Sequence, residues 1–132
     1  MRPIKFRGYN AWKNEWRHGF YLQDRGAHLI VPDMLAPASD ALPYEVVPES
    51  IGQFTGLKDK NGKNIYEGDI IGVKGIPERI EVRFVRGVFA FLWGGDLDDE
   101  LPTGSPTHEW AVVIGNMFEH PELLRRGKQN KE

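Results

Sequence analysis

Glycine and proline interrupt this chain so often that long helices are not expected. The 132 residues include 15 glycines and 9 prolines. The apolar stretches between them are short and rich in Val, Ile, Phe, Tyr and Trp, which favour strands. No window carries the i, i+3, i+4, i+7 stripe of an amphipathic helix. The sequence therefore predicts a mainly β protein built from short strands and tight turns.

The first part of the chain predicts a β-hairpin and an irregular connection. Residues 3–10 are expected as a first strand, since Ile4 and Phe6 alternate with Lys5 and Arg7 as in a half-buried strand. Residues 15–23 are expected to return as a second strand, and residues 27–31 as a third. Residues 32–50 are rich in proline and predict a linker or an irregular connection. A short helix near residues 33–38 is limited by Pro37, which removes a helical hydrogen bond.

The second part predicts a small SH3-like β-barrel with short helical turns. Its expected strands are residues 51–55, 64–66, 70–74, 80–85, 88–93 and 107–114. Short strands joined by tight turns are typical of such barrels. Asn61 and Gly62 predict a type I′ turn, because both residue types tolerate positive φ. Pro77 is expected to end a loop, and Pro121 predicts a helical turn over residues 120–124.

These features predict a mainly β fold with three regions. Residues 1–50 form an N-terminal β-hairpin subdomain and its proline-rich connection. Residues 51–124 form the SH3-like barrel. Residues 125–132 form a basic tail that we expect to be disordered.

One expected strand is apolar on both faces. Residues 88–93 read Val-Phe-Ala-Phe-Leu-Trp, whereas a strand at a barrel surface should alternate. Either both faces are covered within the chain, or one face is buried against another subunit. We favour the second explanation, because exposed apolar patches usually mark contacts. The expected oligomer interface consists of Phe89, Phe91 and Trp93.

Charge and composition narrow the classes of partner. The formal net charge is −2, from 17 basic and 19 acidic side chains, so attraction of the whole surface to nucleic acid or to an anionic membrane is not expected. Basic residues gather in residues 1–25 and in the tail, whereas residues 94–109 are acidic. These segments are either solvated faces or opposite patches that attract each other between subunits.

The sequence contains no signal for a membrane or for an oxidising compartment. Its apolar runs are too short to span a bilayer, and no secretory signal precedes the first strand. Cysteine is absent, which excludes disulfides, thiol catalysis and thiolate zinc sites. We therefore expect a cytoplasmic protein.

No catalytic or metal-binding motif is present. The four histidines are not spaced as metal ligands, and the acidic run 96–100 lacks the glycine and the final glutamate of a calcium loop. The sequence contains no nucleophile elbow, no Walker loop and no dinucleotide-binding fingerprint. We expect a protein that is not an enzyme and that needs no cofactor or metal. A hydrolase is the least favoured alternative, resting on carboxylates that pair only in space.

The predicted N-terminal hairpin interleaves cations with aromatic rings. The residues concerned are Arg7, Trp12, Lys13, Trp16, Arg17 and Tyr21. Such mixtures can bind single-stranded nucleic acid by stacking and phosphate contacts. The alternative is that Trp12 and Trp16 are anchors in the core or in a subunit interface. The negative net charge favours the alternative.

Several stretches of the chain resemble the YopX family of phage and prophage proteins. The longest is QFTGLKDKNGKNIYEGDII at residues 53–71, which is similar to the central signature of the family almost throughout. The others are residues 4–7, 82–84 with 88–91, and 113–124. Residues 24–50 and the tail lie outside the resemblance.

The resemblance implies a fold and an assembly but no reaction. It implies an SH3-like barrel with an N-terminal extension and self-assembly, and it brings no catalytic residue. The leading hypothesis is a non-enzymatic phage-type accessory protein that forms homo-oligomers and binds a phage or host protein. The second hypothesis is a nucleic-acid-associated module that uses the basic aromatic hairpin and the tail.

Overall fold

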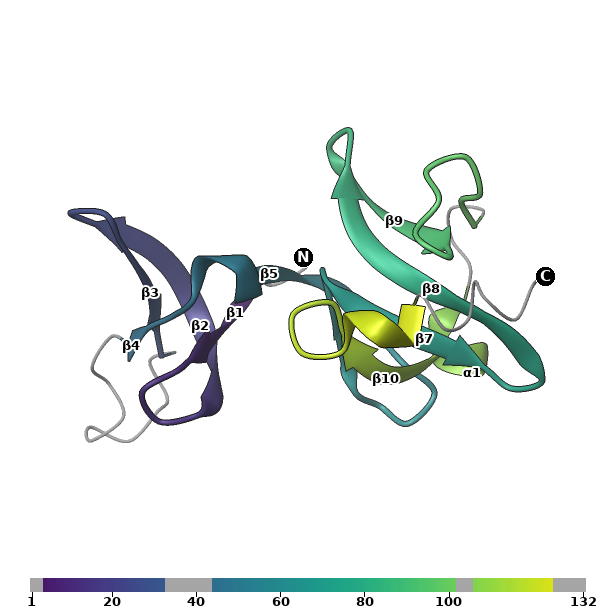
Figure 1. The fold of residues 1–132 in the computed structure, drawn as a ribbon, viewed down its shortest axis with the longest axis horizontal. Helices are drawn as coiled ribbons and strands as arrows, with labels where there is room; N and C mark the ends of the chain where they lie inside the picture. The colour runs from purple at the N-terminus through teal and green to yellow at the C-terminus, as the bar shows by residue number, and fades with distance from the viewer. Residues whose placement is uncertain (1–3, 33–43, 102–105, 125–132) are drawn as a thin grey trace. The chain divides into compact units, whose positions relative to one another are not determined.

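The chain is mainly β and carries two antiparallel sheets, as Figure 1 shows. The computed structural model describes residues 4–32, 44–101 and 106–124. The chain divides into two compact units, Met1–Phe54 and Thr55–Glu132. The boundary falls within strand β5 (Gly52–Lys58), a few residues beyond the boundary expected from the sequence.

The N-terminal unit is built on an antiparallel meander. Its elements are β1 (Phe6–Asn10), β2 (Glu15–Asp24), β3 (Ala27–Val31), β4 (Tyr44–Glu45) and the 3-10 turn η2 (Pro48–Ser50). The strands lie in the order β4-β3-β2-β1, and the start of β5 pairs with β1. The three strands expected here are confirmed. The helical turn considered for residues 33–38 lies outside the described residues.

One face of this meander is the interior of the unit. Ile30 on β3 is fully buried, and Val46 packs directly over Gly8 on β1. A methyl group on Gly8 would lie 2.7 Å from the Val46 side chain, so only glycine allows this close approach. The side of the sheet that carries Ile30 and Gly8 therefore forms the core.

The C-terminal unit holds the second sheet. Its elements are β6 (Asn64–Tyr66), β7 (Asp69–Val73), β8 (Ile76–Val85), β9 (Val88–Trp93), α1 (Thr107–Trp110) and β10 (Val112–Asn116). The sheet order is β10-β7-β8-β9, while β6 pairs with β5 in the other sheet. The core consists of Ile65, Ile71, Ile80, Val82 and Ala111. The described strands form open sheets, so the SH3-like barrel stays a prediction.

The predicted last strand, residues 107–114, was placed too early and missed a helix. Residues 107–110 form the single turn α1, and the strand begins only at Val112. The hydroxyl of Thr107 donates to the Lys58 carbonyl, and the Ala111 carbonyl accepts from the N–H of Lys60. These contacts with distant residues fix the turn. The helical turn predicted near Pro121 is confirmed at residues 121–124.

Two turns also differ from the prediction. Only Gly62 has positive φ in the Asn61-Gly62 turn, so a type I′ turn is wrong there. Both central residues have positive φ in the Arg25-Gly26 and Arg86-Gly87 turns instead. The loop expected to end at Pro77 is shorter than predicted, because β8 already begins at Ile76.

Candidate functional site

The turn between β1 and β2 presents an unusually exposed tryptophan. Trp12 is 91% exposed, although large aromatic side chains are normally well covered. The buried side chain of Asn10 organises the turn. Its oxygen accepts from the backbone N–H of Lys13 at 2.7 Å, and its amide nitrogen donates to the Glu45 carbonyl at 2.8 Å. The turn therefore holds Trp12 outward on a fixed backbone.

A pocket of about 340 Å³ lies beside Trp12. It is lined by Asn10, Ala11, Trp12, Glu45, Val46, Val47 and Pro48. Its floor is fixed by backbone hydrogen bonds from Val46 N–H to the His28 carbonyl and from Val47 N–H to the Tyr9 carbonyl, both 2.9 Å. The residues that line it are mostly apolar, and the backbone carbonyl of Glu45 accepts the hydrogen bond from Asn10 there.

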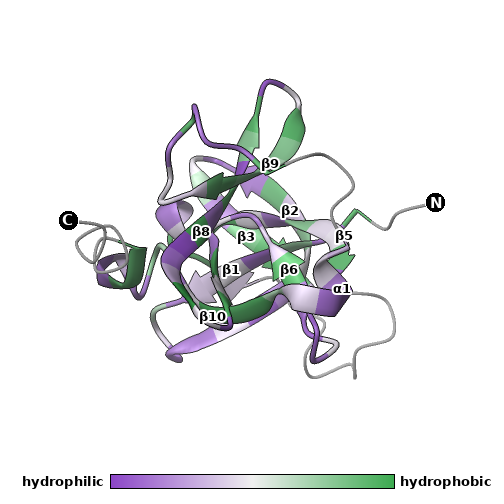
Figure 2. Cartoon of the chain, turned by 90° about the vertical axis from the view of Figure 1, so that its right-hand side faces the viewer, coloured by the Kyte–Doolittle hydropathy of each residue, from purple (hydrophilic) through white to green (hydrophobic). Residues whose placement is uncertain are grey.

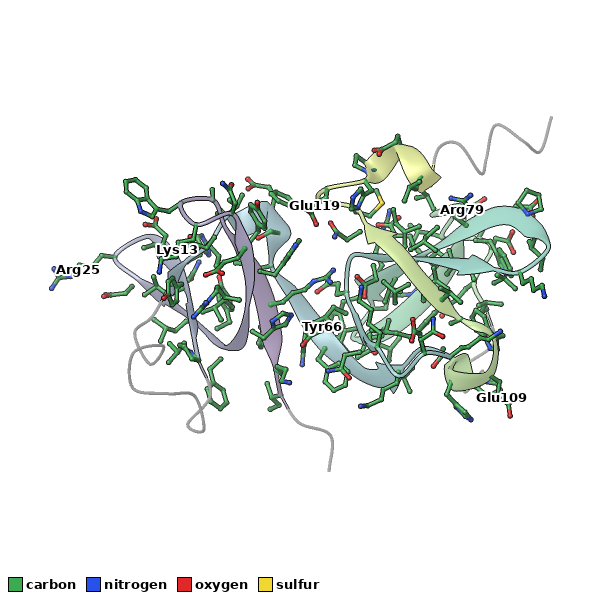
Figure 3. The ribbon with its side chains drawn as sticks, turned by 90° about the horizontal axis from the view of Figure 1, so that it is seen from below. Lys13, Arg25, Tyr66, Arg79, Glu109 and Glu119 are labelled. Atoms are coloured by element: carbon green, nitrogen blue, oxygen red, sulfur yellow. The ribbon has the colours of Figure 1, made fainter. Side chains whose placement is uncertain are left out.

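The structure divides the other predicted contact residues of the hairpin between separate clusters. The Arg7 guanidinium lies 4.8 Å from the centre of the Trp16 ring, while Arg17 lies 3.8 Å from the Tyr44 ring. The ammonium of Lys13, labelled in Figure 3, also lies over Tyr44, at 5.3 Å. These cations contact rings of their own unit.

Tyr21 belongs to a further cluster on the interior side of the sheet. Its hydroxyl lies 2.6 Å from Nδ1 of His28, and the two rings stack at a centroid distance of 5.9 Å. The ring of Phe6 packs against Tyr21 at 5.6 Å. Tyr21 is thus a packing residue, and among the six predicted contact residues only Trp12 and Lys13 are exposed, with Trp12 at 91%.

Basic side chains gather around His18 on β2. The pKa of His18 is lowered, first by partial burial of the imidazole and then by the charges of Arg7, Lys5 and Arg17. The residue nevertheless keeps exposed surface. His18 is therefore mostly neutral near pH 7, and this end of the sheet is positively charged.

A second exposed surface was missed by the sequence analysis. Phe20 and Leu22 on β2 are 52% and 41% exposed. Phe20 lies opposite Val31 and Leu22 lies opposite Leu29, so the four side chains share one face of the sheet. The sequence signal that could have revealed this surface is the spacing in β2, because the apolar residues at positions 20 and 22 lie on the face opposite to Tyr21.

The residues of the predicted oligomer interface lie in a strand whose faces are largely covered within the chain. Phe91 and Trp93 pack against the core, and Ala90 and Leu92 on the other face are 2% and 1% exposed. Residues 90–93 are thus covered in large part within the chain. Phe89 packs edge-to-face with the exposed Phe84 at 5.0 Å.

Within β8 and β9, Val88 and Phe84 are the most exposed large apolar side chains, at 58% and 48%, and both lie near the hairpin turn. Figure 2 shows apolar ribbon next to the hydrophilic tip of this hairpin. The predicted oligomer interface at Phe89, Phe91 and Trp93 stays a prediction, and this tip is the part of the hairpin that a partner can reach.

The described residues contain neither a metal-binding cluster nor a membrane helix. Within residues 4–32, 44–101 and 106–124, no three His, Asp or Glu side chains are grouped so that they could hold a metal ion. No helix in the described part of the chain has the length and apolar character needed to cross a bilayer.

Comparisons with known proteins identify the family to which the chain belongs. The chain is similar to the crystal structure of protein EF1440 from Enterococcus faecalis, with 28% identity and a TM-score of 0.58. This similarity covers 94% of this chain and 99% of that one. None of the curated proteins matches the chain. The family model described as YopX protein matches residues 5–125, and since this is nearly the whole chain, the protein belongs to the YopX family.

Proposed function

We propose that the protein acts by binding a macromolecular partner rather than by catalysis, with Trp12 as the anchor of the contact. The observation that carries this proposal is the 91% exposure of Trp12 on a turn fixed by Asn10. Tryptophan is among the residues that most often dominate binding energy in interfaces. Burial of a large apolar side chain contributes roughly 1.5–3 kcal/mol, and a fixed turn loses little entropy when it binds.

The pocket beside Trp12 indicates the chemistry of the partner. Its volume of about 340 Å³ is at the small end for a ligand site. It suits one or two side chains of a protein partner. The walls formed by Val46, Val47 and Pro48 favour an apolar side chain.

Family membership supports the biological setting of this proposal. YopX-like proteins are expected in phages and prophages, so we place the protein in the cytoplasm of a bacterial host as a self-associating accessory protein. The partner is then a phage or host protein. The short strands of the C-terminal unit support an SH3-like barrel as its architecture.

One observation favours nucleic acid as a second candidate partner. Trp12 offers an open stacking surface, and the exposed residue Lys13 follows it in the same turn. Against this candidate, Arg7 and Arg17 are stacked on rings of their own unit. We therefore rank nucleic acid below protein.

The proposal is tested by capture with matched variants. Immobilised wild-type protein, Trp12→Ala and Leu57→Ala are incubated with lysate of a bacterial host, and retained proteins are quantified by mass spectrometry. Leu57 is an exposed apolar residue of the other unit and serves as the control. We expect Trp12→Ala to lose the specific partner and Leu57→Ala to keep it. Retention of the same proteins by Trp12→Ala would contradict the proposal.

A further inference from the structure

The N-terminal sheet exposes an apolar face on β2 and β3, which we call the β2–β3 apolar face. It consists of Phe20, Leu22, Leu29 and Val31. Residues opposite each other in an antiparallel pair share a face, as do residues two apart along a strand. The four side chains therefore form one continuous patch, half open to solvent.

The opposite face of the same strands is already the interior of the unit. Tyr21 and Ile30 lie opposite each other there, and Ile30 is fully buried. An antiparallel sheet with one buried face normally turns polar residues to solvent on the other. Phe20 and Leu22 break that rule at neighbouring positions of one strand, which indicates that the second face is also covered by a contact.

Opposite charges lie at the two ends of this face. Every second residue of β2 lies on this face, from His18 through Phe20 and Leu22 to Asp24. Arg7 lies opposite His18 on β1, and Lys5 precedes Arg7 by two residues on the same face, so this end is basic. Asp24 at the other end is acidic.

Two further charges lie near the acidic end. Glu45 on β4 lies opposite Leu29 and adds a second acidic group to this face. Arg25 in the adjoining turn extends away from the unit, as Figure 3 shows. The face is therefore apolar at its centre and of opposite sign at its ends.

We propose that two copies of the chain pack through the β2–β3 apolar face about a twofold axis, with the strands antiparallel. A twofold contact requires a self-complementary surface. An apolar centre meets itself in such a contact and opposite ends meet each other, so Asp24 lies over the partner's His18, within reach of the partner's Lys5. Face-to-face sheets pack with closely aligned strands, which this arrangement satisfies.

This inference rests on the self-association that is part of the proposed function and adds its surface and symmetry. Four side chains are a small contact beside the roughly 800 Å² per partner of a standard interface. We therefore expect a reversible dimer that dissociates on dilution, rather than an obligate one.

Charge reversal in both directions tests the symmetry. In the Asp24→Lys variant, the new ammonium of each copy would face the partner's Lys5. In the Lys5→Glu variant, the new carboxylate of each copy would face the partner's Asp24. Both homodimers should weaken by roughly tenfold, because like charges then oppose each other.

A mixture of the two charge variants supplies the complementary measurement. The mixture should form heterodimers with two different end contacts. In one contact, the lysine introduced at position 24 pairs with the glutamate introduced at position 5 of the other copy. In the other contact, the native Asp24 pairs with the native Lys5. Both contacts then pair opposite charges, so we expect near wild-type affinity. Sedimentation velocity with one variant fluorescently labelled measures this.

A substitution in the apolar centre tests the rest of the contact. Leu22→Ser should weaken the dimer, whereas Leu57→Ala should leave it unchanged because Leu57 is an exposed residue of the other unit. Circular dichroism shows that each variant is folded.

The outcomes separate the inference from the proposed function. If wild type stays monomeric at all concentrations, the proposed self-association and this inference both fail. If wild type self-associates but neither the charge variants nor Leu22→Ser weakens it, only this inference fails. A monomer whose β2–β3 apolar face instead captures another protein, with loss in Leu22→Ser, also overturns the second copy as occupant.

Discussion

At the scale of single residues, the Asp59 side chain joins two segments of the second unit that lie far apart in the sequence. Its carboxylate accepts hydrogen bonds from the backbone N–H groups of Asn61 and Lys63 at 2.9 Å, and from Val113 at 3.0 Å. One side chain thus closes the β5–β6 turn and also holds the start of β10. Three donors to a buried carboxylate stabilise its charged form.

We predict that Asp59→Asn destabilises the protein by about 1–3 kcal/mol, because the amide group would place N–H donors against a backbone N–H. Urea unfolding followed by circular dichroism measures the loss. Asp98→Asn is the control, since Asp98 is exposed in the loop after β9. An equal loss in both variants would contradict the role of Asp59.

The same residue predicts a dependence on pH. Burial raises the pKa of Asp59, but the hydrogen bonds from Val113, Lys63 and Asn61 outweigh it, and the pKa is lowered overall. A lowered pKa in the folded state adds stability above the unfolded pKa of about 3.9 and loses it as the pH falls through the folded value. The difference in unfolding free energy between wild type and Asp59→Asn should therefore shrink below about pH 4.

At the scale of elements, strand β9 has one part that packs against the core and one part that is exposed to solvent. Phe91 packs against the core cluster, whereas Val88 at the hairpin tip is 58% exposed. We predict that Phe91→Ala lowers the free energy of unfolding by about 2 kcal/mol or more. Val88→Ser should change it by less than about 0.5 kcal/mol. Urea unfolding at low protein concentration measures both, and similar losses would show that the tip is part of the packed core.

The strands were largely predictable from the sequence because each is set by its own alternation. Phe6, Phe20 and Ile80 all fall in strands that were expected, and glycines mark the turns between them. The helical turn α1 was not predictable, since it depends on a hydrogen bond between Thr107 and Lys58, far apart in the sequence. The prediction of a type I′ turn at Asn61-Gly62 was wrong for a related reason. The side chain of Asp59 determines its shape, and turn propensities do not include that contact.

The candidate site was predictable in part. The aromatic hairpin was found from its composition, but composition could not tell exposed rings from packed ones. Trp12 and Trp16 look alike in sequence, yet Trp16 lies against Arg7 and Tyr9 while Trp12 is exposed to solvent. The β2–β3 apolar face was missed because its two strands have to be paired in register before its residues come together.

At the scale of the whole molecule, the charge distribution favours a protein over nucleic acid as the proposed partner. The net charge is −2, and the cations of the hairpin are stacked on Trp16 and Tyr44. A nucleic-acid-binding surface needs cations that can reach several phosphates, because counterion release supplies most of the affinity. The fold instead uses these cations to stabilise its own rings.

We predict that the protein does not bind a single-stranded oligothymidine at physiological salt and binds it weakly at most at low salt. Fluorescence anisotropy of a labelled oligonucleotide at two salt concentrations measures this, with Trp12→Ala and Lys13→Glu as variants. Tight binding that weakens steeply with salt, and that both variants abolish, would make Trp12 a base-stacking platform. The exposed indole of Trp12 would then stack on a base instead of packing into a protein surface. In either case, the fixed turn that presents the indole would reduce the entropy lost on binding.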